Sequence, residues 1–462
     1  MDNIHYLGIS ELGKQLRGGG LSSVAVTSAL LRRISDQDPR LNSYLTVTSD
    51  LAMAQAEAAD RELREGLDRG PLHGVPLAVK DIFDLKGFPT TAGMPIRSVT
   101  LATEDATIVD RLKRAGAVIL GKNNLTEGVY AEHREDFGPP VNPWDPTRWP
   151  GASSSGSGVA TAAGLCFGAI GSDTGGSIRL PSAANGITGL KPTWGRVSRH
   201  GVFELAATLD HVGPMARSVA DAAAILGIIA GQDTADPTAV PLPVPQYLDE
   251  LSRPIEGLHI GIDSKWISEK VDEPTVRALY AAIATLESLG AVATAVEFPD
   301  PTQIVWDWFQ VCAVQTALAH EATYPVRAGE YGDALKALLE IGRGMTGLDY
   351  QRVIMRRERF RGQVQALFSE VDLLAIPVLA FPTPTVAQMK SVSDEMIFGL
   401  HRFTCSFTMS GHPTITMPGG FGEDGMPIAV QLVAPWFREE FLLRAGHAFQ
   451  SVTDWHRRHP LA

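Results

Sequence analysis

Hydrophobic residues recur along this chain with two different spacings, which separate expected helices from expected strands. In the first seventy residues, apolar side chains repeat at helical spacing over 24–34 and 51–67, with polar residues between them. The pattern changes after Leu72, where 75–79 is a short continuous apolar run that ends in a lysine and an aspartate. Such a run is typical of a buried strand with polar residues at its end.

The next segment repeats this alternation of strand and helix. Asp105 is expected to cap a helix that ends at Gly116 and whose apolar face consists of Ile108, Val109, Leu112 and Ala115. Residues 117–120 then form the next expected strand. A strand–helix–strand order predicts parallel pairing, because the crossover helix returns the chain to the starting end of the sheet.

Later segments continue the pattern. We predict helices at 218–230, at 272–290 with Asp272 as its cap, within 302–368 and around 440–449, and strands at 258–262, 291–298, 373–377, 414–417 and 429–433. The proline-rich stretch 233–245 and residues 377–385 are expected to be surface connections. The sequence therefore predicts the α/β class: a single large domain with a central mixed, mostly parallel twisted sheet covered by helices on both faces.

Composition narrows the classes of function. The chain has 462 residues with 40 Lys+Arg and 52 Asp+Glu, which gives a formal net charge of −12. This acidic balance, with no Lys/Arg-rich run, argues against a nucleic-acid-binding surface. The apolar stretches are shorter than a membrane span, and the N-terminal residues do not resemble a secretory signal. Because Cys166, Cys312 and Cys405 lie far apart among apolar residues, we expect free thiols and a cytoplasmic setting.

Several common catalytic motifs are absent from the sequence. It contains no HExxH motif or Cys/His cluster for zinc, and no GxxxxGK[ST] loop for a nucleotide. It also lacks the GxSxG and SxxK motifs of serine hydrolases. We therefore expect no metal and no cofactor, and chemistry by another arrangement of side chains.

Two blocks rich in glycine and serine stand out, GASSSGSG at 151–158 and GSDTGGSIR at 171–179. The composition of the first block is also that of a flexible linker. However, the block leads directly into 159–167, which is small and apolar and must be buried. A linker between two domains is therefore disfavoured.

The second block suggests a nucleophile. Two glycines precede Ser177, and glycine allows backbone N–H groups to converge on one point, where they would stabilise a developing oxyanion. Ser177 is then well placed to attack a carbonyl carbon. A phosphate-binding loop is the alternative, although such a loop usually has Lys or Arg beside it.

A serine nucleophile needs a base, and none of the twelve histidines is an obvious one. His133, His200 and His211 lie nearest in sequence and are more typical of surface or structural histidines. Lys80, at the end of the expected strand, would serve if burial lowered its pKa enough to keep the amine neutral. Considered alone, an ion pair between Lys80 and Asp81 or another carboxylate is the simpler interpretation.

Together these motifs resemble the amidase signature family. The matching segments follow one another in the right order and are GVPLAVKD (74–81), both Gly/Ser blocks, GLKPTWGRVSRHG (189–201) and LDHVGPMARSV (209–219). The resemblance implies the amidase signature fold in one amidase domain over 1–462. This domain would comprise a helical N-terminal region (1–70), the signature core (71–230) and a remainder with substrate-pocket elements (231–462).

The resemblance also implies a Ser–cisSer–Lys triad. Ser177 matches the nucleophile, Ser153 the bridging serine after a cis peptide bond, and Lys80 the general base. The expected oxyanion hole consists of the backbone N–H groups of Thr174, Gly175 and Gly176, continuing to Ser177. Because the relay needs a neutral lysine, it predicts loss of activity at acidic pH.

Two positions depart from the usual GGSSGGS pattern of the family. Ala152 adds a methyl group at the expected cis bond, and Ser155 replaces a glycine. Neither change removes a catalytic group. Arg179, which matches the family, is expected to form an internal ion pair with Asp81 or Asp173.

The function implied by the resemblance is hydrolysis of a linear amide through an acyl-enzyme on Ser177, an activity of EC 3.5.1 type. Segments 130–141, 306–309 and 381–403 either line the pocket or serve packing, and aromatic lining would suit a small aryl or hydrophobic amide. The alternatives are an amidotransferase A-type subunit that releases ammonia from glutamine in a tRNA-dependent complex, and a carbamate hydrolase. We expect a small-molecule amide as partner, no nucleic acid and no membrane; the sequence is compatible with a homodimer.

Overall fold

The architecture rests on a large mixed sheet that crosses the molecule. A computed structural model describes residues 4–460. The strands within them are β1 (Tyr44–Val47), β2 (Pro76–Lys80), β3 (Val118–Asn123), β4 (Gly168–Asp173), β5 (Thr188–Lys191), β6 (His211–Ala216), β7 (His259–Ile262), β8 (Val292–Ala295), β9 (Leu373–Pro377), β10 (Thr414–Phe421) and β11 (Pro427–Val433). They pair in the order β1-β3-β2-β4-β6-β5-β10-β11-β9-β7-β8.

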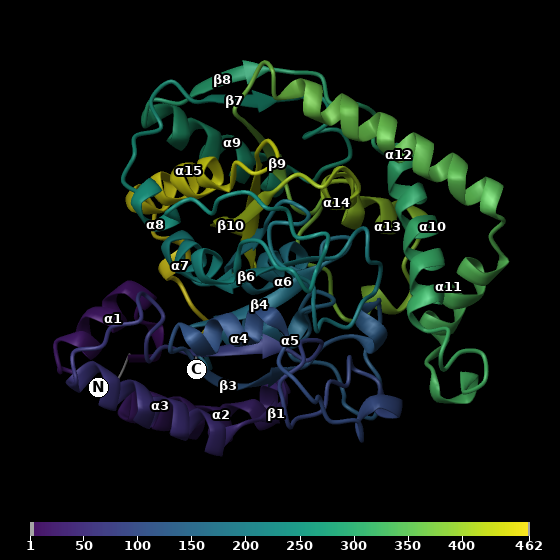
Figure 1. Cartoon of the computed structure of the whole chain (residues 1–462). Coiled ribbons are helices and arrows are strands. Elements are labelled where there is room, and N and C mark those ends of the chain that lie inside the picture. Colours follow the sequence, from purple (N-terminus) through teal and green to yellow (C-terminus); the bar gives the residue numbers. More distant parts are fainter. Residues whose placement is uncertain (1–3, 461–462) are drawn as a thin grey trace.

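Helices flank this sheet (Figure 1). They are α1 (Ile9–Arg17), α2 (Ser23–Leu41), α3 (Ser49–Arg64), α4 (Thr107–Arg114), α5 (Ser155–Ala162), α6 (Arg179–Asn185), α7 (Val219–Ile229), α8 (Tyr247–Glu250), α9 (Glu273–Ser288), α10 (Thr302–Ala319), α11 (Asp333–Gly344), α12 (Gly347–Leu367), α13 (Asp394–His401), α14 (Cys405–Ser410) and α15 (Glu439–Val452). Figure 1 shows α1 to α3 beside the β1 end of the sheet, and α10 to α12 as a group on the other side of the molecule. None of the helices within 4–460 is long and apolar enough to cross a membrane.

Strand directions confirm the mixed sheet but correct the expectation that it is mostly parallel. Among the described residues, parallel pairing is confined to β3–β2–β4 and β9–β7–β8. The other neighbours, from β4 through β6, β5, β10 and β11 to β9 and also β1–β3, are antiparallel. The strand–helix–strand patterns around 75–120 and 258–298 do produce parallel pairs. The middle of the sheet is instead built by chain reversals such as the β10–β11 hairpin, whose direction a hydrophobic run does not reveal.

Most predicted elements lie within a few residues of their expected positions, but of the predicted caps Asp105 is wrong and Asp272 is confirmed in position only. Ser218 does cap α7, since its hydroxyl accepts a hydrogen bond from the Asp221 N–H at 3.1 Å. Asp105 does not cap α4, because its carboxylate accepts from the Lys86 N–H at 2.8 Å and pairs with Lys113 at 2.7 Å. Asp272 occupies the position before α9 without a capping hydrogen bond from its side chain.

The Gly/Ser-rich block lies in the centre of the core. Every residue of α5 is buried, and so are all residues of β2, β3 and β4 around it. A Cβ atom on Gly156 would lie 2.4 Å from the Ser43 carbonyl oxygen and 2.6 Å from that of Asn124. Small residues are therefore required here because other backbone segments approach closely, and the block is not a linker.

Candidate active site

Lys80 ends β2 with its side chain completely buried. Its Nζ lies 2.7 Å from the Ser153 Oγ and 2.9 Å from the Ser172 Oγ. The neighbouring Asp81 pairs with Lys122 instead, at 2.6 Å. The alternative ion pair between Lys80 and Asp81 is therefore wrong, and the amine faces two hydroxyl groups.

Burial changes the protonation of this lysine. It lowers the pKa of Lys80 to about 7, although the carboxylates of Asp210 and Asp173 favour the charged form. An amine with this pKa is largely neutral at slightly alkaline pH. It can then accept a proton from the hydroxyl that it contacts.

Ser153 is held in a tightly fixed turn before α5. The peptide bond between Ala152 and Ser153 is cis, as the resemblance implied. Gly151 adopts a φ of 80°, and a Cβ there would lie 2.3 Å from the Cα of Pro181. The next residue, Ser154, donates its hydroxyl to the Ser172 carbonyl at 3.1 Å. The turn is therefore bonded to β4, the strand that leads to the second Gly/Ser block.

Ser177 lies between β4 and α6 and is half-buried, whereas Ser153 is completely buried. The Ser177 carbonyl accepts the Ser154 N–H at 3.3 Å, which ties the two blocks together. Within residues 4–460, no hydrogen bond joins the hydroxyls of Ser153 and Ser177. The structure thus joins Lys80 to Ser153 directly, and brings Ser177 to them through the backbone.

The loop at 174–177 has some N–H groups that are already in use. The Asp173 carboxylate accepts the N–H groups of Gly176 at 2.8 Å and of Ile178 at 3.1 Å. The Gly176 N–H is therefore already bonded, which removes it from the expected set of oxyanion donors. Within the described part of the chain, the N–H groups of Thr174, Gly175 and Ser177 have no hydrogen-bond acceptor.

Arg179 forms its ion pair with Asp173 and not with Asp81. The two side chains are completely buried, with Nη2–Oδ1 at 2.8 Å and Nε–Oδ2 at 2.9 Å. Burial alone would raise the pKa of Asp173, but the Arg179 guanidinium outweighs it and holds that pKa well below its usual range. The ionised Asp173 therefore anchors the loop permanently.

The three histidines nearest in sequence stay outside the lysine–serine contacts. The Nε2 of His133 lies 2.8 Å from the Ser155 Oγ, and burial followed by the nearby Lys80 lowers the pKa of His133 to about 4. The Nδ1 of His211 lies 2.6 Å from the Leu209 carbonyl oxygen, and His200 lies 3.6 Å from Glu104 near the surface. The hydroxyl that Ser155 adds to the family pattern therefore has a partner in His133.

Sequence reasoning missed four residues that hold the loop and the lysine. They are Ser172 and Asp210, which lie inside matched motifs, and Trp308 and Thr404, which do not. Asp210 accepts the Thr174 hydroxyl at 2.6 Å, and burial raises the pKa of Asp210 to about 6. Trp308 lies in the segment 306–309, which was expected to line the pocket or serve packing, but no local signal marks its contact with the loop or marks Thr404.

Aromatic side chains from two of the expected pocket segments lie beside this loop. The ring centroid of His401 is 5.2 Å from that of Trp308 and 5.7 Å from that of Phe309. The Nδ1 of His401 lies 3.4 Å from the Gly175 carbonyl oxygen. Phe309 and His401 are half-buried, so they form a partly exposed aromatic wall next to Gly175.

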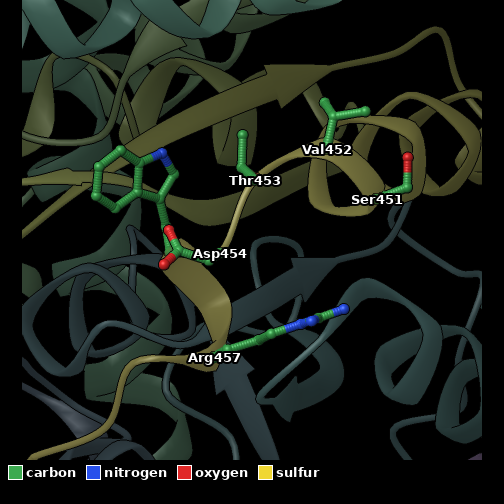
Figure 2. Close-up of a pocket in the computed structure, with 6 residues that line it drawn as sticks. Ser451, Val452, Thr453, Asp454 and Arg457 are labelled. Atoms are coloured by element: carbon green, nitrogen blue, oxygen red, sulfur yellow. The ribbon is translucent and has the colours of Figure 1, made fainter.

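A surface hollow lies elsewhere. It has a volume of about 440 Å³ and is lined by residues at and after the end of α15, namely Ser451, Val452, Thr453, Asp454, Trp455 and Arg457. Figure 2 shows these side chains at the end of α15 and in the segment after it, and the hollow is lined by none of the residues described above. Within 4–460, no group of three or more His, Cys, Asp or Glu residues is placed to hold a metal ion.

Comparison with known proteins gives consistent matches over most of the chain. A family model described as Amidase matches residues 25–443. A Mycobacterium tuberculosis protein that bears the name amidase AmiD is 45% identical over 462 residues, covering 99% of this chain and 97% of that protein. The A-type subunit of the glutamyl-tRNA(Gln) amidotransferase from Halorhodospira halophila is 38% identical and is matched over 99% of both chains. The peptide amidase of Stenotrophomonas maltophilia has a similar structure, with a TM-score of 0.86 at 30% identity over 98% of both chains.

Proposed function

Because the chain belongs to the amidase signature family, whose members act on carbon–nitrogen bonds, we propose that it hydrolyses linear carboxylic amides with Ser177 as the nucleophile. The observation that carries this proposal is the contact of a buried lysine amine with a serine hydroxyl. The Lys80 Nζ lies 2.7 Å from the Ser153 Oγ, and its pKa of about 7 makes the amine a base near neutral pH.

The proposed reaction moves protons along one line of groups. Neutral Lys80 accepts the proton of Ser153, Ser153 accepts that of Ser177, and the Ser177 oxygen forms a bond to the amide carbon. The same groups then return a proton to the amide nitrogen, the carbon–nitrogen bond breaks, and the amine leaves. Water next attacks the acyl group on Ser177 by the same proton path, which releases the acid and restores the serine.

The charge that develops on the carbonyl oxygen needs donors. The N–H groups of Thr174, Gly175 and Ser177 are the candidates, because the Gly176 N–H is bonded to Asp173 at 2.8 Å. Backbone donors held in a buried loop stabilise an oxyanion well, since they need not reorganise during the reaction. Ser177 is half-buried, whereas Lys80 and Ser153 are completely buried, so Ser177 is the one of the three that lies closest to solvent.

For the substrate, we propose a small aryl or hydrophobic amide. The support is the partly exposed aromatic wall of Phe309 and His401 beside Gly175, which packs on the buried Trp308. Burial lowers the pKa of His401 to about 4, so this wall carries no charge at neutral pH. An uncharged aromatic surface favours apolar groups over small charged ones.

The test uses the purified chain alone with aryl anilides, aliphatic amides, carbamates and glutamine, beside a Ser177→Ala variant. We expect turnover of aryl or hydrophobic amides that Ser177→Ala abolishes. A wild-type chain that turns over none of these compounds, or a fully active Ser177→Ala variant, would contradict the proposal.

The amidotransferase alternative has its own support in the 38% identity to the Halorhodospira halophila amidotransferase chain. Under that alternative, glutamine is the preferred amide and its hydrolysis rises strongly when partner subunits are added. Preference for carbamates over the matching amides would support the third possibility. The same substrate panel therefore separates the three functions.

A further inference from the structure

Helix α10 reaches the proposed oxyanion-binding loop with one side chain. The Trp308 Nε1 donates to the Thr174 carbonyl oxygen at 2.7 Å, and both residues are buried. The indole also packs directly on Gly175, where a Cβ atom would lie 2.3 Å from the indole Cζ2. The Trp308 ring thus limits position 175 to glycine.

The hydrogen bond from the Trp308 indole to the Thr174 carbonyl also determines the direction of the Gly175 N–H. The peptide unit between Thr174 and Gly175 is planar and trans, so its C=O and its N–H point in opposite directions. Holding the Thr174 carbonyl against the indole therefore directs the Gly175 N–H away from it. That N–H has no acceptor within the described residues.

The next two peptide units of the loop are held differently. The Gly175 carbonyl accepts the Thr404 hydroxyl at 2.7 Å, but the N–H of that unit belongs to Gly176 and is bonded to Asp173. The Gly176 carbonyl accepts the Leu180 N–H at 2.7 Å, a bond within the backbone of α6 and its first turn. Of these three units, only the one between Thr174 and Gly175 combines an unused N–H with an anchor from a distant side chain.

We infer that Trp308 is a positioning residue for the reaction, because its indole N–H orients the Gly175 N–H toward the oxyanion. The inference rests on the proposed function. Trp308 acts through Thr174 and need not touch the reacting atoms. Its N–H should therefore matter more for the transition state than for the bound substrate.

The test compares Trp308→Phe with Trp266→Phe. The first variant keeps an aromatic ring but removes the donor to Thr174. The second makes the same change in the core at an indole N–H that has no acceptor within 4–460, and leaves the loop untouched. Thermal unfolding of both proteins reports whether they fold, and Trp308→Met provides a second variant if the phenylalanine protein does not.

Removing one oxyanion donor typically lowers kcat by 10²–10³-fold, so loosening one is expected to lower kcat by about 10- to 100-fold. We expect this loss in Trp308→Phe with KM within about threefold of wild type, since KM reports largely on ground-state binding. Trp266→Phe should keep its kcat.

An inhibitor pair separates positioning from packing. A trifluoromethyl ketone that adds to the serine and forms an oxyanion should bind the Trp308 variant about 10- to 100-fold more weakly, whereas the matching alcohol should bind unchanged. Equal weakening of both inhibitors, or an unchanged kcat, would overturn the inference. Wild-type inactivity, or an active Ser177→Ala protein, would instead overturn the proposed function and this inference with it.

Discussion

Two regions of the chain meet at the loop 174–177, and they contribute different kinds of group. In the first region, β2, β4 and the turn before α5 bring together the side chains of Lys80, Ser172 and Ser153. In the second region, α10 and the turn between α13 and α14 supply Trp308 and Thr404, which bind carbonyl groups of the loop. The first region carries the groups that we propose move protons, and the second orients the backbone.

The comparison shows that the groups proposed to react come from short motifs, whereas the groups that orient the loop backbone come from distant segments of the chain. The reacting groups need several polar side chains in close contact, so their residues cluster in short motifs. A carbonyl group needs only one donor, and any element that passes nearby can supply it. Changes in the first region should therefore abolish activity, whereas changes in the second should reduce it.

The largest effect is expected for Lys80→Met in the first region. A general base contributes about 10²–10⁴-fold to a reaction, so kcat should fall by this factor in an amide assay. Methionine fills similar space and has no amine to desolvate, but the buried hydroxyls of Ser153 and Ser172 lose their partner, so the free energy of unfolding should change by no more than about 1–3 kcal/mol. Full activity in the folded variant would remove Lys80 from the mechanism.

Arg179→Met tests the residue that links the two regions. Arg179 pairs with Asp173 and also donates to the Thr404 carbonyl at 2.8 Å. Removing one partner of a buried ion pair costs about 3–5 kcal/mol in the free energy of unfolding. Denaturant titration measures the change, and Arg361→Met, which breaks an exposed pair with Glu358, should cost less than about 1 kcal/mol. Equal losses in the two variants would argue against the linking role.

These regions also differ in how much the sequence alone could predict. The resemblance to the amidase signature family predicted that Lys80 and Ser153 lie together. The residues alone marked Lys80 only as a candidate base at the end of an expected strand, and an ion pair with a carboxylate was the simpler interpretation. The alternating pattern located most helices and strands. The antiparallel middle of the sheet was not predicted, since hydrophobic runs carry no direction. The loop contacts of Trp308 and Thr404 were not predicted either, although 306–309 was expected to line the pocket or serve packing. Each is a single contact between segments far apart in the chain.

A smaller effect is expected for Thr404→Val in the second region. The variant keeps the shape of the side chain but removes the donor to the Gly175 carbonyl at 2.7 Å. Loss of one hydrogen bond is worth about 0.5–1.5 kcal/mol, so kcat should fall by no more than about tenfold. Steady-state kinetics beside Lys80→Met measure the contrast. A loss as large as that of Lys80→Met would break the distinction between the two regions.

The pH dependence of kcat/KM should follow the protonation of Lys80, in the first region. Because the proposed base must be neutral, kcat/KM should rise with pH and reach half its maximum near the Lys80 pKa of about 7. The histidines His133 and His401, whose pKa values are lowered to about 4 by burial, are already neutral there and cannot produce this limb.

Asp210→Asn tests whether the rise of kcat/KM with pH belongs to Lys80. Asp210 favours the charged form of Lys80, so removing its negative charge should lower the lysine pKa. More of the amine is then neutral at low pH, and the midpoint should move to lower pH by up to about one unit. The midpoint is read from the full profile of kcat/KM, whatever its height. A midpoint that stays in place or rises would show that the limb belongs to another group.

The smallest effect is expected for Ser155→Gly, which restores the usual residue of the family at the edge of the first region. The change removes the 2.8 Å contact between the Ser155 hydroxyl and the His133 ring, a single hydrogen bond worth about 0.5–1.5 kcal/mol of stability. Neither group contacts Lys80 or Ser153 through a hydrogen bond, so kcat/KM should stay within about threefold of wild type. Ser153→Gly, two residues earlier, is the matched control and should lose activity as strongly as Lys80→Met. If Ser155→Gly lost as much, proton movement would have to include His133, and the division between reacting and orienting groups would have to be drawn differently.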